Sequence, residues 1–209
     1  MKMHHWTGLC LITLLAACGG GGGGDDDDEP IAPTPDPQVT VTVTDGTTQR
    51  SFVITLSPTQ APVTVANFLG YVRSGWYNGI AFHRHAPGFV LQGGGYLAPL
   101  GTTALPAAKA ASAPIALEVG KGLSNTRYTV AMARTNVLDS ATSEFYVNLA
   151  NNTFLDTSGG GYAVFGQVTS GTDVIDAFQT APCVATLWLA AGECLPTPNL
   201  VIVSAVQTR

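Results

Sequence analysis

Charged residues are scarce in this chain of 209 residues, which contains nine Lys and Arg against fourteen Asp and Glu. Six of the acidic residues lie between positions 25 and 36, and Lys2 is the only basic residue ahead of them. Residues 38–209 therefore hold eight acidic and eight basic residues. A near-neutral domain without a basic stripe has nothing to hold a phosphate backbone. We therefore expect no nucleic acid among its partners.

Long apolar runs are also missing. The apolar run at residues 6–17 is too short to span a bilayer, and it follows the single basic residue Lys2. Small residues then precede Cys18 in the sequence LAAC. This pattern resembles a bacterial lipoprotein signal peptide, which implies cleavage before Cys18 and acylation of that residue. An ordinary secretory signal cut nearby is the alternative.

The segment after Cys18 has little that a folded core could bury. It reads GGGGGG and then DDDDEPIAPTPDP, which are respectively flexible and extended compositions. We therefore divide the chain into a signal peptide at residues 1–17, a lipid-anchored disordered tether at 18–37 and one folded domain at 38–209. An acidic tether is repelled by anionic lipid, so the acyl chains are the expected hold on the membrane. Gly19, where aspartate would retain an enteric lipoprotein at the inner membrane, favours the outer membrane and a domain in the periplasm.

Cysteine is as scarce as charge, with four residues in all. Cys10 lies in the leader and Cys18 is the expected anchor, which leaves Cys183 and Cys194. In an exported protein, two such cysteines without a histidine near them in the sequence favour a disulfide that closes a surface loop over a metal site. Two unpaired buried thiols remain the alternative.

Local patterns in the domain indicate a mainly β fold. Alternating apolar residues at 39–43 and 52–56 flank Asp45-Gly46, which predicts two antiparallel strands joined by a turn. Pro62 and apolar residues at helical spacing predict a helix over about 62–74, and a second helix is expected at 172–179. Short apolar runs separated by Gly, Pro, Asn and Asp fill the rest, as in a closed barrel whose ends need covering.

Three longer blocks carry a family resemblance. They read FHRHAPGFVLQGG from position 82, YTVAMARTNVLDSATSEFYVNLANNTFLD from 128 and GYAVFGQVTSGTDVIDAF from 161. In order and spacing they resemble the cyclophilin family of peptidyl-prolyl cis-trans isomerases, over about residues 39–180. The resemblance implies an eight-stranded closed antiparallel β-barrel capped by two α-helices. It also implies a monomeric enzyme without cofactor or metal, which binds proline-containing segments of exported proteins and cyclosporin-like ligands.

The resemblance also assigns residues. Arg84 matches the catalytic arginine of the family, and the substrate groove corresponds to Phe89, Val90, Gln92, Ala133, Arg134, Glu144, Tyr146, Phe154, Leu155 and Tyr162. Glu144 and Tyr146 depart most from the family, which usually has glutamine and phenylalanine there. Val90 replaces a frequent methionine. These departures leave a proline-peptide-binding module without turnover as the alternative function.

The expected chemistry explains why an arginine is set among apolar residues. Rotation about an X-Pro bond is slow because the amide is resonance-stabilised, with a barrier of about 20 kcal/mol. In the twisted transition state the proline nitrogen regains a lone pair, to which a permanently charged guanidinium can donate a hydrogen bond. A group that stabilises the twisted amide more than the planar one lowers the barrier.

Other interpretations of the same residues have less support. His83 and His85 are spaced to share one face of a strand, but no third ligand is placed to complete a metal site. The run Gly93-Gly94-Gly95 lacks the lysine and helix of a phosphate loop. Ser140 and its neighbours lack the G-x-S-x-G turn of a hydrolase. Phe165 is expected in the core.

Overall fold

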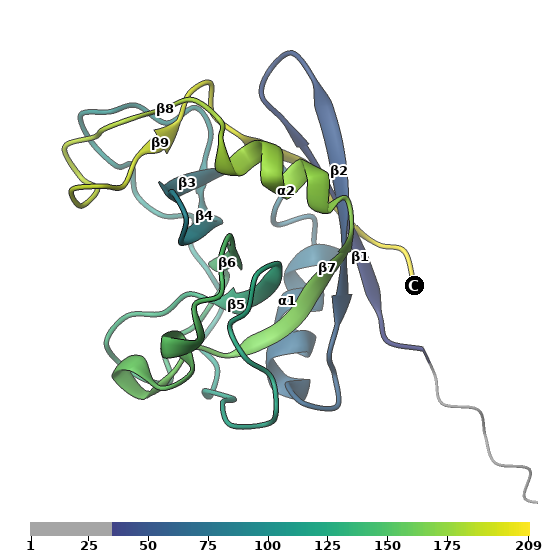
Figure 1. Ribbon diagram of the computed structural model, residues 1–209. Coiled ribbons are helices and arrows are strands. Elements are labelled where there is room, and N and C mark those ends of the chain that lie inside the picture. The colour runs from purple at the N-terminus through teal and green to yellow at the C-terminus, as the bar shows by residue number, and fades with distance from the viewer. Residues whose placement is uncertain (1–34) are drawn as a thin grey trace, which may run out of the picture. The chain divides into compact units, whose positions relative to one another are not determined.

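The computed structural model describes residues 35–209, which form one compact unit (Figure 1). The predicted signal peptide, Cys18 and all but the last three residues of the predicted tether lie outside the described residues. The elements in chain order are β1 (Gln38–Thr44), β2 (Gln49–Leu56), α1 (Pro62–Arg73), β3 (Ile80–Ala86), β4 (Val90–Leu97), β5 (Thr129–Met132), β6 (Phe145–Asn148), the short 3-10 helices η1 (Thr153–Asp156) and η2 (Ser158–Gly160), β7 (Val164–Ser170), α2 (Thr172–Gln179), β8 (Cys183–Val184), β9 (Leu195–Pro196) and β10 (Val201–Gln207).

Eight of the strands close into an antiparallel barrel, in the order β1-β10-β3-β4-β6-β5-β7-β2. β1 pairs with β2 on one side and with β10 on the other. This confirms the predicted barrel and its mainly β character. In the described part of the chain, no helix combines the length and the apolar character needed to cross a membrane.

The first hairpin follows the predicted alternation. Alternate residues of β1, from Val39 to Val43, point into the barrel and are buried. The turn between the strands is held by Asp45, whose Oδ1 accepts hydrogen bonds from the backbone N–H groups of Thr47 and Thr48 at 2.9 and 2.8 Å. These bonds lower the pKa of Asp45 to about 2. A local sequence signal is thus sufficient to build this hairpin.

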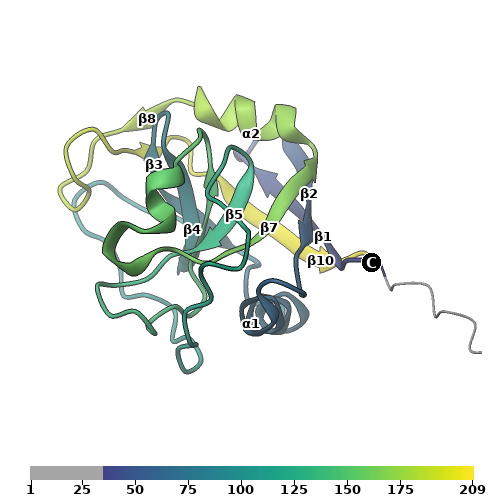
Figure 2. The ribbon, with the colours of Figure 1, turned by 60° about the horizontal axis from the view of Figure 1, so that its bottom comes forward.

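Two helices lie on opposite sides of the barrel in both ribbon views (Figures 1 and 2). α1 begins at Pro62 and has no side-chain cap of its own. Glu118 supplies one from a distant loop, because its carboxylate accepts the N–H groups of Val63 and Thr64 at 3.2 and 2.8 Å. The helix buries Phe68 and Leu69 against the core. α2 buries its apolar face, including Phe178, in the same core.

The barrel wall separates two apolar clusters, because side chains alternate across each strand. The larger cluster fills the barrel and includes the fully buried aromatic residues Phe52, Phe68, Tyr77, Phe82, Phe145 and Phe165. The predicted core position of Phe165 is therefore confirmed. The smaller cluster consists of Ala86, Val90, Ala131, Tyr146, Leu155 and Val164, with Phe89, Leu123, Ala133 and Tyr162 packed against it. Its residues on β4, β5 and β6 are immediate sequence neighbours of core residues, so the second cluster is a direct product of strand alternation.

Candidate active site

A pocket of about 190 Å³ lies over the smaller apolar cluster. Its lining consists of Arg84, Phe89, Val90, Gln92, Ala133, Arg134, Tyr146, Leu155 and Tyr162. Nine of the eleven residues assigned from the sequence blocks therefore meet at one place, on strands and loops that are far apart in the chain. A larger hollow of about 300 Å³ lies beside the end of α2 and contains none of these residues.

Arg84 is the charged residue on β3 that reaches this apolar pocket. Its Nη1 donates a hydrogen bond to Gln92 Oε1 at 3.1 Å, and its Nη2 lies 2.5 Å from Glu193 Oε1. The guanidinium carbon lies 5.7 Å from the centre of the Phe89 ring. A guanidinium has five N–H donors, so three remain after these two bonds. The site therefore presents a fixed cation with free donors beside an apolar hollow.

Gln92 connects Arg84 to Glu144. Its amide nitrogen donates to Glu144 Oε2 at 2.8 Å, so the amide oxygen must face Arg84. Glu144 itself lines a second hollow of about 200 Å³ that shares Gln92, Ala133 and Arg134 with the pocket. Burial raises the pKa of Glu144, and the bond from Gln92 opposes that rise. The Glu144 carboxylate accepts from the amide nitrogen of Gln92 and thereby directs the amide oxygen towards the Arg84 guanidinium.

His83 contacts the same oxygen of Glu144 that accepts from Gln92, with Nε2 3.4 Å from Oε2. Burial and the neighbouring charge of Arg84 lower the pKa of His83 to about 4. The imidazole is therefore neutral at pH 7, and its contact with Glu144 is not an ion pair despite the short distance. His85 points to a different partner, Cys194, so the two histidines do not form the shared ligand pair considered from their spacing.

The glycine run makes room for this polar chain. A Cβ atom on Gly94 would lie 2.5 Å from the backbone oxygen of Ser143, and one on Gly95 would lie 2.6 Å from Glu144 Oε1. Gly94 also has a φ of +109°. The run is therefore required for close approach of β4 to the segment that carries Glu144, as the sequence indicated.

Tyr146 lines the pocket, and its hydroxyl is hydrogen-bonded to a buried side chain. The hydroxyl donates to Asn125 Oδ1 at 2.8 Å, and the same oxygen accepts a bond from Asn148 at 3.1 Å. Burial raises the pKa of Tyr146, so the hydroxyl stays protonated. Asn125 is fully buried and was not identified from the sequence. This network explains how a tyrosine fits where phenylalanine is usual in the family.

Arg134 stabilises one wall of the pocket. Its guanidinium donates to the backbone oxygens of Gly159 and Gly161 at 2.7 Å and lies 4.5 Å from the centre of the Tyr162 ring. Leu155 is buried in the pocket floor. Phe154 is 58% exposed and stacks on Phe89 at 5.8 Å between ring centres, so it lies at the rim rather than in the lining.

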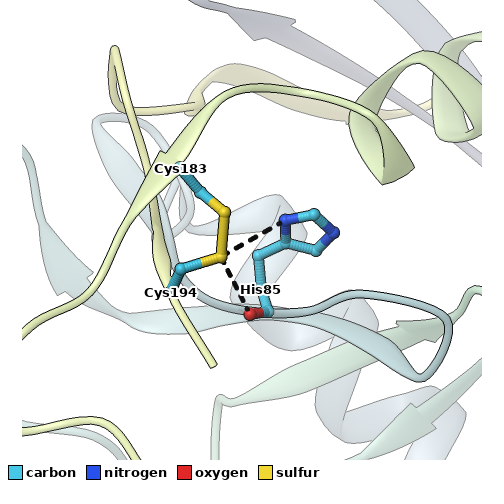
Figure 3. A group of neighbouring side chains, drawn as sticks. All are labelled: His85, Cys183 and Cys194. Carbon is cyan, nitrogen blue, oxygen red and sulfur yellow. Dashed lines mark hydrogen bonds between the residues drawn. A yellow bond between two sulfur atoms is a disulfide. The ribbon is translucent and has the colours of Figure 1, made fainter. Parts of the chain in front are cut away.

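The remaining cysteines form a disulfide, Cys183–Cys194, with 5.5 Å between the Cα atoms. Figure 3 shows it beside His85, whose Nδ1 lies 3.8 Å from Cys194 Sγ. No histidine lies near these cysteines in the sequence, but the fold brings one beside them, and the predicted disulfide is present. β3 brings His85 to Cys194, because their backbones exchange two hydrogen bonds of 2.8 and 2.9 Å. Ligand atoms of the three residues lie within 4.8 Å of one another, but the two sulfurs are bonded to each other.

Glu193 is the second residue at the site, after Asn125, that sequence reasoning missed. It precedes Cys194 in the loop closed by the disulfide and forms an ion pair with Arg84 across 109 positions of the chain. The guanidinium lowers the pKa of Glu193, which is therefore ionised at pH 7. The one available signal was that it is among only eight acidic residues of the domain and lies beside a cysteine.

Comparison with known proteins identifies the family. Residues 39–206 match the family described as cyclophilin type peptidyl-prolyl cis-trans isomerase/CLD. A peptidyl-prolyl cis-trans isomerase of Streptomyces antibioticus is 46% identical over 66% of this chain and 82% of its own length. Peptidyl-prolyl cis-trans isomerase B of Escherichia coli K12 is 40% identical over 80% of this chain and 99% of its own.

Solved structures agree on the fold. A cyclophilin-type peptidyl-prolyl cis-trans isomerase of Cryptosporidium parvum superposes with a TM-score of 0.64 at 19% identity. The match covers 83% of this chain and 98% of that one. Another structure of the Cryptosporidium protein, determined in the presence of the dipeptide Ala-Pro, has the same score and covers 82% of this chain and 99% of that one. The barrel, the pocket and these matches together show that the chain belongs to the cyclophilin-type peptidyl-prolyl cis-trans isomerases.

Proposed function

We propose that this isomerase accelerates X-Pro rotation in exported proteins during folding, with Arg84 as its catalytic residue. The observation that carries the proposal is the placement of the Arg84 guanidinium at the edge of an apolar pocket, with three N–H donors left free. Phe89, Tyr146 and Leu155 enclose the pyrrolidine ring of the substrate, and the guanidinium donates to the proline nitrogen or holds the prolyl carbonyl.

The reaction needs only this arrangement, because no covalent bond forms or breaks. In the planar amide the nitrogen lone pair is delocalised into the carbonyl, whereas in the twisted amide it is localised on nitrogen. Donation from Arg84 therefore strengthens as the bond twists, which is the condition for lowering the barrier. The partial burial of the Arg84 side chain, which is 23% exposed, strengthens this interaction relative to one in bulk water.

Two further observations support the proposed place of action. The leader and LAAC pattern indicate export and acylation at Cys18, with the domain in the periplasm and the anchor in the outer membrane. The Cys183–Cys194 disulfide fits an oxidising compartment. The enzyme acts there as a monomer and reaches its clients without a cofactor.

A protease-coupled assay with a proline tetrapeptide tests the catalytic assignment. Arg84→Ala should lower kcat/KM about 100-fold, which is typical for loss of one preorganised donor in a shielded site. Arg84→Lys is the matched control, because it keeps the charge but not the fork of donors, and should recover only part of the rate. Circular dichroism should show unchanged folding. Equal rates for wild type and Arg84→Ala would contradict the proposal, and peptide binding without acceleration would favour the binding-module alternative.

A further inference from the structure

Arg84 is held from two sides, and only one of its partners was foreseen. Gln92 accepts from Nη1 and Glu193 accepts from Nη2, so the two acceptors define the plane of the guanidinium. The side chains of Arg84 and Glu193 are 23% and 19% exposed. An ion pair shielded to this extent is stronger than one on the open surface.

Glu193 holds the guanidinium without taking the place of a substrate. It is not among the residues that line the pocket, whereas Arg84 and Gln92 both are. Its carboxylate therefore contacts the guanidinium without forming part of the pocket lining. A long arginine side chain has many rotamers, and a bonded partner reduces the number that compete with the productive one.

The loop that carries Glu193 is built onto the strand that carries Arg84. Cys194, the next residue, exchanges two backbone hydrogen bonds with His85, the next residue after Arg84. The disulfide ties Cys194 to Cys183 (Figure 3). β9, which begins at the residue after Cys194, pairs with β8, which begins at Cys183. The Glu193 carboxylate is thus held near β3 by the backbone hydrogen bonds between the next residue, Cys194, and His85.

We propose that Glu193 is a positioning residue for Arg84, and that the loop closed by Cys183–Cys194 is the support that holds it in place. This inference rests on the proposed catalytic role of Arg84. It predicts that Glu193 acts through the guanidinium on the rate of the bound substrate and contributes little to substrate binding.

The test measures kcat and KM separately on the proline tetrapeptide. Glu193→Ala should lower kcat about tenfold and change KM less than about twofold. Glu193→Gln keeps an oxygen acceptor of the same reach and should recover kcat to within about threefold of wild type. Leu187→Ala, in the same loop with a side chain that is 83% exposed, is the control and should leave both constants unchanged.

A double-mutant cycle separates positioning from a general structural role. In the Arg84→Ala background, Glu193→Ala should change the rate less than about twofold, because the group it positions is gone. A similar loss in both backgrounds would overturn the inference, and so would a Glu193→Ala enzyme as fast as wild type or faster. If circular dichroism shows that Glu193→Ala is unfolded, the test depends on Glu193→Gln. A Glu193→Gln enzyme whose kcat is more than about threefold below wild type would then overturn the positioning role of Glu193. Failure of the Arg84 assignment is seen separately, as an Arg84→Ala enzyme with wild-type rate.

Discussion

Glu144 is the residue at which this site differs most in charge from its family. An acid here has two possible effects. It can pair with Arg84 and weaken the donation from the guanidinium to the twisted amide, or it can face along the groove and contact the substrate residue beside proline. Gln92 stands between the two side chains and bonds to both. Glu144 instead lines the adjoining hollow together with Thr142 and Ser140. The structure thus favours a role in selecting the residue next to proline.

We predict that Glu144→Gln changes kcat/KM on neutral peptides less than about tenfold, a barrier difference below about 1.4 kcal/mol. The wild type should prefer peptides with Lys or Arg beside the proline, and the preference should weaken with added salt. It should also weaken as pH falls through the raised pKa of Glu144, because the protonated acid has no charge. Rates on paired cationic and neutral tetrapeptides measure this. A large rate gain for Glu144→Gln on neutral peptides would show that the acid restrains Arg84.

His83 gives stability a pH dependence. Its pKa falls from 6.5 to about 4 on folding, so the unfolded chain binds the proton more readily. The free energy of unfolding should therefore be highest above pH 6.5 and decrease as pH falls towards 4. Between pH 7.5 and 5, His83 should account for a loss of about 2 kcal/mol. Urea unfolding of wild type and His83→Gln at both pH values checks this. The free energy of unfolding of the variant should fall less between the two pH values, because the contribution of His83 is missing. Parallel losses in the two proteins would contradict it.

At the scale of elements, local sequence patterns predicted the elements that local interactions determine. The β1–β2 hairpin and both helices follow from alternation, helical spacing and turn residues within a few positions of one another. The cap of α1 does not, because Glu118 comes from 54 positions away. The pairing of Arg84 with Glu193 spans 109 positions and depends on closure of the barrel and on a small sheet of two-residue strands. No period in the sequence encodes such contacts.

The pocket residues were predictable for a different reason. Family blocks assigned nine residues that line the pocket, including Tyr146 and Leu155. The same blocks placed Phe154 with them, although η1 turns its ring outward onto Phe89. Asn125 and Glu193 lie outside the motif positions that the blocks assign. Recognition by motif therefore found residues that line the pocket and left out Asn125 and Glu193, which bond to two of them.

The disulfide should stabilise the C-terminal loop region. Cys183 and Cys194 are 11 positions apart, and closing a loop of that length stabilises by about 2–3 kcal/mol when the bond is unstrained. Replacing both cysteines with alanine should lower the free energy of unfolding by that amount, as measured with urea. Reductant should destabilise wild type and leave the double variant unchanged. Two alkylatable thiols in periplasm-derived protein, found by mass spectrometry without reductant, would rule the bond out.

At the scale of the whole molecule, we propose that Cys18, which lies outside the described residues, sets the location. We predict that Cys18→Ser releases the protein from membranes, because acyl chains on this cysteine are the expected hold on lipid. Fractionation of cells measures this, and Gly19→Asp is the companion variant, which should move the protein from the outer to the inner membrane. Equal membrane retention of the serine variant would contradict the anchor.

The order of strands in the barrel also sets where the described chain enters the domain relative to the groove. β6, which carries Tyr146, is the fourth strand from β1 in either direction around the ring of eight. Residue 35 leads directly into β1, at the right of Figure 1. The described chain therefore enters the barrel in the wall opposite the strand that carries Tyr146. A client segment bound in the groove would lie against β6, four strands around the ring from the strand at which the described chain begins.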